Sequence, residues 1–489
     1  MTDQKVGDLA YIKKHSLLGV FALLFRTFFL QLIALVATFL LTVFLSPSEY
    51  GVYFIVSAVV NLLVYFSDIG LAAALIQKPQ KPTDKDYQTT FTIQQFLVFS
   101  LVALALLFSS HIARWYQLDA PSLWLFRALV FSLVFSSLKT IPSIILERAL
   151  KFDKLIVPQI LENLSFYLVA VFGAWRGWGV TSFTVAVLVR GLVGVVTLYL
   201  LAPWRPSFHL DRRSAKQLLS FGVPFQLNSL LALVKDDLLT AFLGRILPLN
   251  EVGFLGWAQK WAFFPLRFFM DAINKVTFPA YSRLQNQPQA LAKAVEKSLY
   301  AVAVSVLPTL TGLTLVAPHL IRLFPRYQKW QPALLPLTFF CLNALIASLS
   351  TSLTNLLSGI GQIKVNLKLM VFWTVLTWLT TPWLVFKIGY SGAALASVVV
   401  ASTSWLTLLM AKRYVRFRFW RQVLPALFST AVMALFFWEL QSLVTSLPRL
   451  ILLIVASAII YFATLVLLDG RRLRAEVALV VNTFLNKNA

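Results

Sequence analysis

The residues best able to do chemistry in this sequence are cations that lie inside long apolar runs. There are eight of them: Arg26, Arg127, Lys139, Arg190, Lys235, Lys260, Arg267 and Lys275. A charge at the centre of a bilayer costs about 2.5–3.5 kcal/mol, so eight lipid-facing cations would oppose insertion by roughly 20 kcal/mol or more. We therefore expect most of them to line a water-filled cavity that receives an anionic cargo carried on a lipid.

The apolar run over residues 251–281 carries the densest pattern of these cations. Steps of four, three, four and four residues place one face of a helix at Lys260, Phe264, Arg267, Asp271 and Lys275. Asp271 can pair with Arg267 and Lys275, which lie one turn away on either side. Pro265 frees a backbone carbonyl and is expected to bend the helix. One acid cannot neutralise three cations, so we favour a cavity wall over the alternative, an ion-paired seam between helices.

The remaining candidates for cargo binding are spread over other runs. Arg26 lies about ten residues into the first run, roughly 15 Å deep at 1.5 Å per residue, which is beyond the reach of a snorkelling side chain. Arg190 is flanked by Gly191 and Gly194, and Lys235 begins a compact charged cluster. The predicted set that binds a pyrophosphate or lines the cavity is Arg26, Arg190, Lys235, Lys260, Arg267 and Lys275.

Five acids accompany these cations as predicted counter-ions or coupling groups: Asp68, Glu162, Asp236, Asp237 and Asp271. A carboxyl group in a low-dielectric site can have its pKa raised toward neutrality, which would suit Asp68 or Glu162 to proton or sodium coupling. Either acid can equally serve as a counter-ion to Arg26 or Arg190, and we favour this second role.

The composition is that of a polytopic membrane protein. Of 489 residues, 59% are hydrophobic and 13% are charged, and apolar runs of 18 or more residues recur from end to end. The formal charge of +24 would suggest nucleic acid in a soluble protein, but here most lysines and arginines fall in short loops on one side of the predicted membrane. We therefore expect no nucleic-acid partner, and place both termini in the cytoplasm of a multi-pass protein of the bacterial inner membrane.

Several chemistries find no support in the sequence. A single cysteine, Cys341, excludes an internal disulfide, and four scattered histidines (His15, His111, His209 and His319) do not predict a metal site. The sequence has no phosphate-binding loop of the GxxxxGK[ST] type and no long external loop for catalytic groups. We expect no enzyme activity, no metal and no cofactor.

Apolar runs broken by turn residues predict about fourteen transmembrane helices in an all-α fold. They cover 16–45, 50–77, 88–112, 121–146, 154–176, 179–201, 217–245, 251–281, 295–320, 332–358, 365–387, 390–411, 422–441 and 449–468. A short repeat organises them, because PSEYGV at Pro47–Val52 opens the second run and PLNEVG at Pro248–Gly253 opens the eighth. Repeats of six helices in the same orientation predict two bundles related by an axis along the membrane normal.

The predicted organisation follows from this repeat. An N-terminal six-helix lobe covers 1–202, a cytoplasmic linker 203–216 and a second six-helix lobe 217–411. Two extra transmembrane helices cover 412–469, and 470–489 form an amphipathic cytoplasmic tail that lies at the membrane interface.

The sequence resembles the polysaccharide transporters of the multidrug/oligosaccharidyl-lipid/polysaccharide flippase superfamily, the Wzx-type flippases. The resemblance rests on Arg26 and on the stretches Leu45–Tyr53, Ser67–Leu71, Ile76–Lys78, Glu147–Phe152 and Phe278–Gln285. It implies two six-helix lobes around a central cavity, alternating access, and a polyprenyl-pyrophosphate-linked oligosaccharide as cargo. Two extra C-terminal helices also occur in some members of the superfamily.

Three functions remain to be compared. The leading one is a flippase for a lipid-linked glycan in cell-surface polysaccharide export, with membrane lipids, a polymerase and glycosyltransferases as partners. An ion-coupled drug antiporter of the same superfamily would want acids in the cavity, whereas cations predominate here. A membrane-embedded glycan polymerase or ligase would need a large external loop, which the sequence lacks. Arg26, Lys260 and Arg267 are the residues we expect to engage the pyrophosphate.

Overall fold

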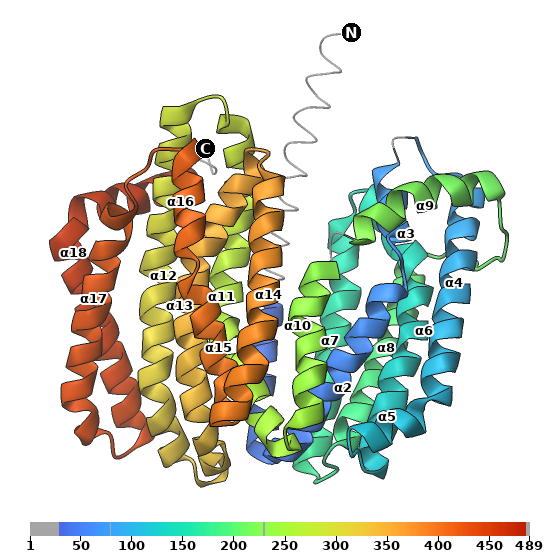
Figure 1. Cartoon of the computed structure of the whole chain (residues 1–489), viewed down its shortest axis with the longest axis horizontal. Coiled ribbons are helices and arrows are strands. Elements are labelled where there is room, and N and C mark those ends of the chain that lie inside the picture. Colours follow the sequence, from blue (N-terminus) through green and yellow to red (C-terminus); the bar gives the residue numbers. More distant parts are fainter. Residues whose placement is uncertain (1–28, 79, 228–229, 486–489) are drawn as a thin grey trace. The chain divides into compact units, whose positions relative to one another are not determined.

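The computed structural model describes residues 29–78, 80–227 and 230–485, and these ranges contain helices and no β-strand (Figure 1). The prediction of an all-α membrane protein is confirmed. The chain divides into two compact units, Met1–Gly256 and Trp257–Ala489, which are described one at a time.

Unit 1 holds a helix at Phe29–Phe44 and the labelled helices that follow it. These are α2 (Pro47–Phe66), α3 (Leu71–Gln77), α4 (Asp84–Leu107), α5 (Ser109–Trp115), α6 (Ala120–Arg148), α7 (Phe152–Trp175), α8 (Thr181–Leu201), α9 (Arg212–Leu227), α10 (Leu230–Ile246) and the start of α11 (Leu249–Leu284).

Unit 2 holds the rest of α11 and the helices that follow it. These are α12 (Pro288–Leu323), η1 (Pro325–Ala333), α13 (Leu334–Gly359), α14 (Ile363–Ile388), α15 (Ser391–Ser402), α16 (Trp405–Tyr414), α17 (Phe419–Leu440), η2 (Gln441–Leu443) and α18 (Leu447–Leu485). Helix α17 packs between α12 and α18, so the two predicted extra helices belong to this unit.

Eleven stretches in the described chain are helical, long and apolar enough to cross a membrane. The predicted count of fourteen is not confirmed, because three predicted spans fall outside this set. Only Phe29–Phe44 of the first span is described, α10 is described over 17 residues, and α11, although 36 residues long, is not apolar enough. The excess charge on α11 is the feature from which the cavity was predicted.

The compact units do not follow the predicted boundary at residues 203–216. Helices α9 and α10 pack on α2, α3 and α4, and so extend unit 1 as far as Gly256. The backbone of α9 approaches the start of α3 closely at a glycine. A Cβ atom on Gly222 of α9 would lie 2.8 Å from the carbonyl oxygen of Ile69. The division into two six-helix lobes with a linker at 203–216 stays a prediction.

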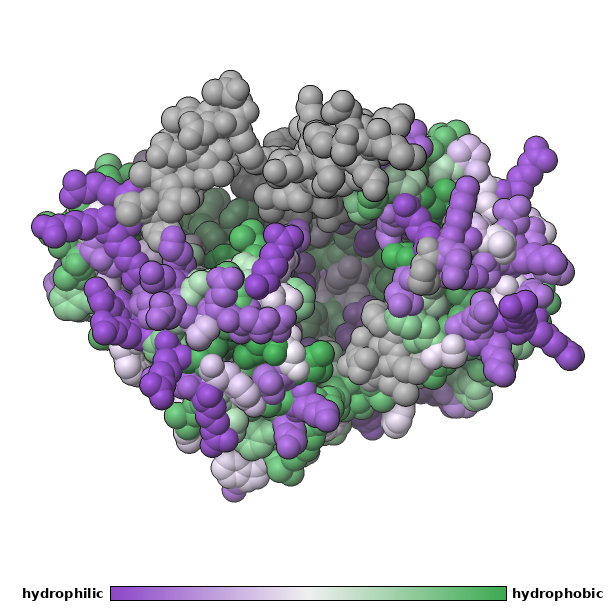
Figure 2. Space-filling view, turned by 90° about the horizontal axis from the view of Figure 1, so that it is seen from above, coloured by the Kyte–Doolittle hydropathy of each residue, from purple (hydrophilic) through white to green (hydrophobic). Residues whose placement is uncertain are grey.

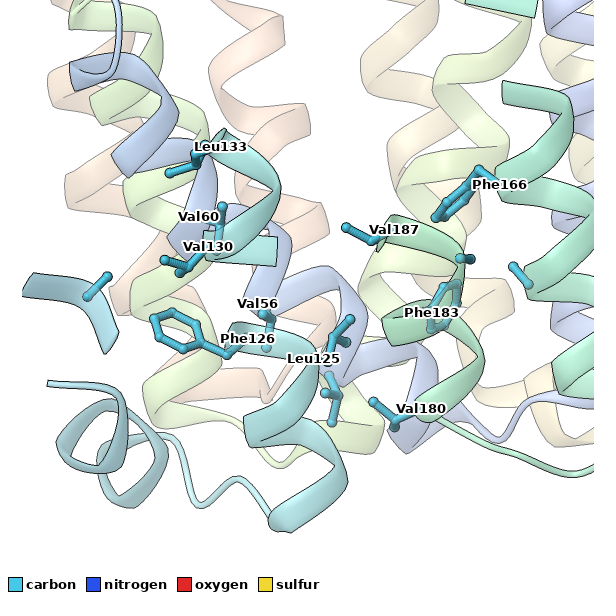
Figure 3. Packing of buried hydrophobic residues seen from close by; sticks show 14 of the residues in the cluster. Val56, Val60, Leu125, Phe126, Val130, Leu133, Phe166, Val180, Phe183 and Val187 are labelled. Carbon is cyan, nitrogen blue, oxygen red and sulfur yellow. The ribbon is translucent and has the colours of Figure 1, made fainter. Parts of the chain in front are cut away.

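The core of unit 1 is a cluster of buried aliphatic and aromatic side chains from the helix Phe29–Phe44 and from α2, α4, α6, α7 and α8 (Figure 3). Val56 and Val60 of α2 face Leu125 and Phe126 of α6 in this cluster. Helix association in lipid gains little from hydrophobicity and depends on close packing. Interdigitation of these side chains therefore fixes how these helices are placed within unit 1.

The two copies of the repeat motif meet within unit 1. Gly51 of α2 and Gly253 of α11 lie where the helices touch backbone to backbone. A Cβ atom on Gly51 would lie 2.0 Å from the Leu249 carbonyl oxygen, and one on Gly253 would lie 1.9 Å from the Pro47 carbonyl oxygen. Only glycine fits at such a crossing.

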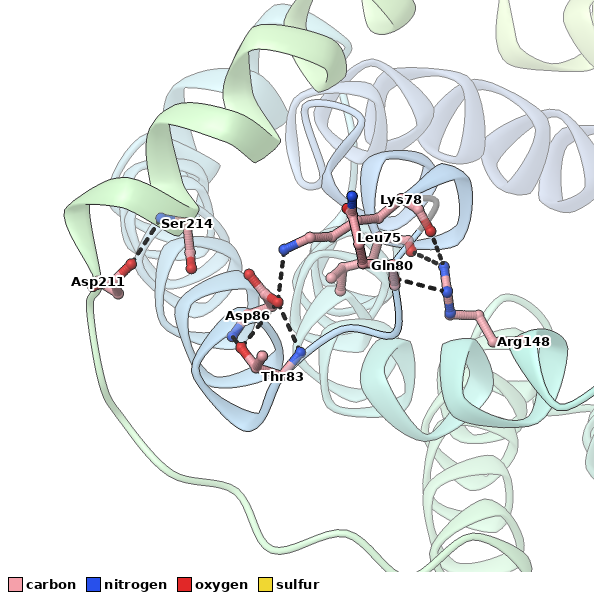
Figure 4. Close-up of polar contacts among 8 residues, drawn as sticks. All are labelled: Leu75, Lys78, Gln80, Thr83, Asp86, Arg148, Asp211 and Ser214. Atoms are coloured by element: carbon pink, nitrogen blue, oxygen red, sulfur yellow. Dashed lines mark hydrogen bonds and ion pairs between the residues drawn. The ribbon is translucent and has the colours of Figure 1, made fainter.

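A polar cluster secures the end of α3 and the start of α4 (Figure 4). The Arg148 guanidinium donates to the carbonyl oxygens of Leu75, Ile76, Lys78 and Gln80 at 2.7–3.1 Å. These contacts satisfy carbonyls that the end of the helix leaves unpaired.

The same cluster reaches the segment that precedes α9. Lys78 pairs with the buried Asp86 at 2.8 Å. The Ser214 amide donates to Asp211 at 2.8 Å, and this bond together with one from the Ser214 hydroxyl lowers the pKa of Asp211. An ionised Asp211 is suited to cap the first turn of α9.

Hydrophilic side chains crowd the end of each unit seen in Figure 2. In unit 1 the exposed cations include Lys85, Arg205, Arg212 and Arg213, and in unit 2 they include Lys412, Arg413, Arg418 and Arg421. Lys and Arg are enriched in cytoplasmic segments of membrane proteins. The placement of both termini in the cytoplasm stays a prediction.

The C-terminal helix bends where the sequence predicts a change from span to tail. Asp469 has non-helical backbone angles (φ −143°, ψ 32°) inside α18. After this bend the Arg472 guanidinium lies 4.1 Å from the centre of the Tyr300 ring. The predicted span, 449–468, ends at this kink. The interfacial role of the tail stays a prediction, and residues 486–489 of it lie outside the described residues.

Candidate functional site

The charged face of α11 is exposed along its whole length in unit 2. Lys260, Arg267, Asp271 and Lys275 are all exposed, whereas Ala258, Ala262 and Met270 are buried among the helices of the unit. We call these four exposed residues the α11 stripe. Fifteen residues separate its ends, which is about 22 Å along a helix.

The ion pairs predicted within the α11 stripe are not formed. In the part of the chain that the structure describes, no ion pair joins Asp271 to Arg267 or Lys275. The side chains are therefore not locked together as a structural seam. Three cations remain available to an anionic ligand.

A second charged cluster lies among α6, α7 and α8 of unit 1. The Glu162 carboxylate accepts a hydrogen bond from Lys139 at 2.7 Å, and Arg190 Nε lies 3.9 Å from its other oxygen. Glu162 and Lys139 are largely buried, while the Arg190 side chain is 45% exposed. Glu162 is thus a counter-ion shared by two cations, and the cluster keeps one positive charge.

Glycine and aromatic residues shape this cluster. A Cβ atom on Gly194 of α8 would lie 2.1 Å from Glu162 Oε1, so the carboxylate fills space that only glycine leaves open. The Arg190 guanidinium lies 5.8 Å from the centre of the Phe166 ring, in cation–π contact. The exposed guanidinium is thereby held in place without being neutralised.

The charged cluster of α10 is less compact than its sequence suggests. Lys235 Nζ lies 3.8 Å from Asp236 Oδ1. Asp237 points instead toward α2, where Asn61 Nδ2 donates to it at 3.0 Å. Consecutive residues on a helix project about 100° apart, which separates these two acids.

The other predicted site residues have separate environments. Asp68 Oδ1 accepts a bond from the Ala72 amide at 3.2 Å and so caps the start of α3. Arg127 donates to Ser109 at 3.3 Å and lies over the Trp124 ring. Arg26 lies outside the described residues. No cluster of three or more metal-ligating side chains occurs in the ranges that the structure covers.

Sequence reasoning missed a group of amides and hydroxyls beside the α11 stripe. Asn355 Nδ2 of α13 donates to Thr277 Oγ1 at 2.9 Å and to Asn274 Oδ1 at 3.3 Å, both on α11. Asn366 Nδ2 of α14 donates to Ser358 Oγ at 2.6 Å and to the Thr354 carbonyl oxygen at 2.7 Å. A search for asparagines inside apolar runs, in addition to charges, would have found them.

The fold is shared with known membrane transporters. The lipid II flippase MurJ in an inward closed conformation superimposes with a TM-score of 0.68 at 16% identity, over 90% of this chain and 99% of MurJ. An inward-facing multidrug transporter of the MATE family gives a TM-score of 0.64 at 16% identity, over 78% of this chain and 95% of that one. These likenesses define the fold class.

Sequence comparison then identifies the family. A family model described as polysaccharide biosynthesis protein matches residues 40–335, more than half of the chain, so the chain belongs to this family. The family and the fold are those of transporters and not of catalysts, which confirms the expected resemblance and the expectation that the chain is not an enzyme.

Individual relatives are distant. An uncharacterized membrane protein in the cps region of Klebsiella pneumoniae is 24% identical over 367 residues, which are 73% of each chain. The succinoglycan biosynthesis transport protein ExoT of Rhizobium meliloti is 22% identical over 65% of this chain and 64% of its own. The lipopolysaccharide biosynthesis protein WzxC of Escherichia coli is 27% identical over 35% of each.

Proposed function

We propose that this chain is a flippase that moves a polyprenyl-pyrophosphate-linked oligosaccharide from the cytoplasmic to the outer leaflet by alternating access. The names of its relatives, which concern lipopolysaccharide and succinoglycan biosynthesis, support a role in cell-surface polysaccharide export. The bacterial inner membrane would be its location, with a polysaccharide polymerase and glycosyltransferases as its partners.

The observation that carries this proposal is the exposed and unpaired state of the α11 stripe. Cations that met only lipid would cost about 2.5–3.5 kcal/mol each, so they are placed to meet water and an anion. Arginine and lysine bind phosphate oxygens through charge-assisted hydrogen bonds, and arginine can do so with two parallel bonds. A pyrophosphate group is therefore a suitable ligand for this face.

The length of the stripe indicates how the cargo would be handled. A span of about 22 Å is too long for a single pyrophosphate to touch every cation at once. Lys260 and Arg267 lie two turns apart, and their long side chains can converge on one group. Lys275 would then meet the same group at another stage of its passage, as Arg190 would on unit 1. Arg26 completes the proposed set.

The sign of the charge favours this cargo over the alternative. A multidrug transporter shares the fold, but an organic cation as cargo would be repelled by a face with three cations and one acid. The single acid, Asp271, would shield neighbouring cations from each other when no cargo is bound.

The proposal is tested by replacing Arg267 with alanine. Purified protein in proteoliposomes would be given a polyprenyl-pyrophosphate-linked oligosaccharide, and its arrival in the opposite leaflet would be measured. Loss of one charge-assisted contact is worth about 1.5–3 kcal/mol, so we expect translocation to slow at least 10-fold with membrane insertion intact. Lys387→Ala, which removes an exposed cation from the last turn of α14, is the matched control and should transport normally. Equal rates for the wild type and Arg267→Ala would remove Arg267 from the site.

A further inference from the structure

We propose that two asparagine amides beside the α11 stripe form a subsite for the first sugars of the cargo. The subsite consists of Asn274 of α11 and Asn355 of α13, and Thr277 of α11 holds Asn355 in place from outside the subsite. This inference rests on the proposed function, because it assigns the sugar part of the same cargo to a place on unit 2.

The subsite adjoins the Lys275 end of the α11 stripe, which the pyrophosphate would meet at one stage of its passage. Asn274 lies three residues after Asp271 and directly before Lys275, and residues three apart are neighbours on a helix surface. A sugar joined to a pyrophosphate lies within a few ångströms of it. A ligand anchored on Lys275 would therefore bring its first sugar against Asn274.

The hydrogen bonds already made leave capacity for a ligand. Asn355 uses its amide nitrogen toward Thr277 and Asn274, and Asn274 uses its oxygen as the acceptor. In the described part of the chain, neither the Asn274 nitrogen nor the Asn355 oxygen makes a hydrogen bond, and neither is among the buried polar atoms without a partner. One donor group and one acceptor therefore remain without a partner in the described chain, and neither is fully buried.

This pairing suits a carbohydrate. An amide supplies two N–H donors and a carbonyl with two lone pairs, and a sugar presents neighbouring hydroxyls that both donate and accept. The bonds from Asn355 fix the two asparagines in place before any ligand arrives, which limits the ordering cost of binding. A neutral polar subsite next to a cationic one matches a neutral sugar joined to a pyrophosphate.

The same contacts could serve only to join α11 and α13, since asparagine bonds between membrane helices are worth about 0.6–2 kcal/mol. Sugar binding and the contact between α11 and α13 can be assigned to different residues. Thr277 accepts the shorter bond, 2.9 Å, and has no free donor nitrogen, whereas Asn274 accepts the longer one, 3.3 Å, and carries the unused nitrogen. Thr277→Val should therefore affect the helix contact, and Asn274→Ala the sugar.

The test compares two lipids on the full-length protein in nanodiscs: polyprenyl pyrophosphate, and polyprenyl pyrophosphate bearing one hexose. We expect the wild type to bind the hexose-bearing lipid more tightly. Asn274→Ala should weaken its binding about 10-fold and leave binding of the sugar-free lipid unchanged. Thr277→Val should lower the unfolding temperature while keeping the preference for the sugar.

The outcomes that would overturn the subsite are distinct from those that would overturn the flippase proposal. The asparagines would serve only to join the helices if the wild type showed no preference for the hexose-bearing lipid. The same would follow if Asn274→Ala weakened the binding of both lipids equally. A wild type that binds neither lipid would refute the pyrophosphate cargo itself.

Discussion

At the scale of single residues, Glu162 decides whether the charges of unit 1 are structural or functional. Its carboxylate holds two cations, Lys139 at 2.7 Å and Arg190 at 3.9 Å. Glu162→Gln would leave largely buried Lys139 without a counter-ion. Because an unsatisfied buried group costs about 1–3 kcal/mol, we expect a lower unfolding temperature in a thermal melt of the purified protein.

A double variant provides the control for this prediction. Lys139→Met combined with Glu162→Gln removes the stranded charge together with its partner, so it should recover much of the lost stability. If Glu162→Gln melts like the wild type but no longer transports, the carboxylate acts as a coupling group and our counter-ion assignment is wrong.

Some features of the candidate site could be predicted from the sequence. The spacing of Lys260, Arg267 and Lys275 places them on one helix face, and the structure exposes that face. The pairing of Lys139 with Glu162 joins residues 23 positions apart on different helices, so local spacing carries no sign of it. Asn274 and Asn355 were missed because uncharged amides do not stand out in an apolar run.

At the scale of helices, the crossing of α2 and α11 depends on two glycines. Added Cβ atoms on Gly51 and Gly253 would fall 2.0 Å and 1.9 Å from backbone oxygens that have no freedom to move aside. We expect Gly51→Ala or Gly253→Ala to lower the yield of folded protein and its unfolding temperature, measured by fluorescence-detected size exclusion.

The matched control for this crossing is Gly312→Ala in α12. A Cβ atom there would meet nothing within 4 Å, and alanine favours a helix over glycine by roughly 0.5–1 kcal/mol. This variant should be as stable as the wild type or more so. If Gly253→Ala had the folded yield and unfolding temperature of the wild type, the two helices would not touch as described.

Helix positions were largely predictable from the sequence, whereas contacts between helices far apart in the sequence were not. Apolar runs end at turn residues, so most predicted spans coincide with helices. The run at 50–77, however, is broken into α2 and α3 by Ser67–Gly70, where Ile69 and Gly70 have positive φ. The helices of the run at 217–245, α9 and α10, pack on α2, α3 and α4 through contacts with residues far away in the sequence.

At the scale of the whole molecule, an anionic cargo makes transport sensitive to the membrane potential. An anion that leaves a negative cytoplasm moves down the potential, and each uncompensated charge gains about 2.3 kcal/mol per 100 mV. A potassium diffusion potential, negative on the side of loading, should therefore accelerate translocation in proteoliposomes. A rate independent of the potential would mean that the cargo crosses with its charge fully neutralised.

The identity of the cargo is the central claim, and one measurement tests it most directly. Proteoliposomes containing the wild-type protein would be offered, in separate experiments, a polyprenyl-pyrophosphate-linked oligosaccharide and a lipophilic organic cation, and the initial rate of each crossing would be measured. The exposed cations of α11 predict rapid translocation of the pyrophosphate lipid and none of the cation above protein-free vesicles. Translocation of the organic cation, with no translocation of the pyrophosphate lipid, would contradict this account.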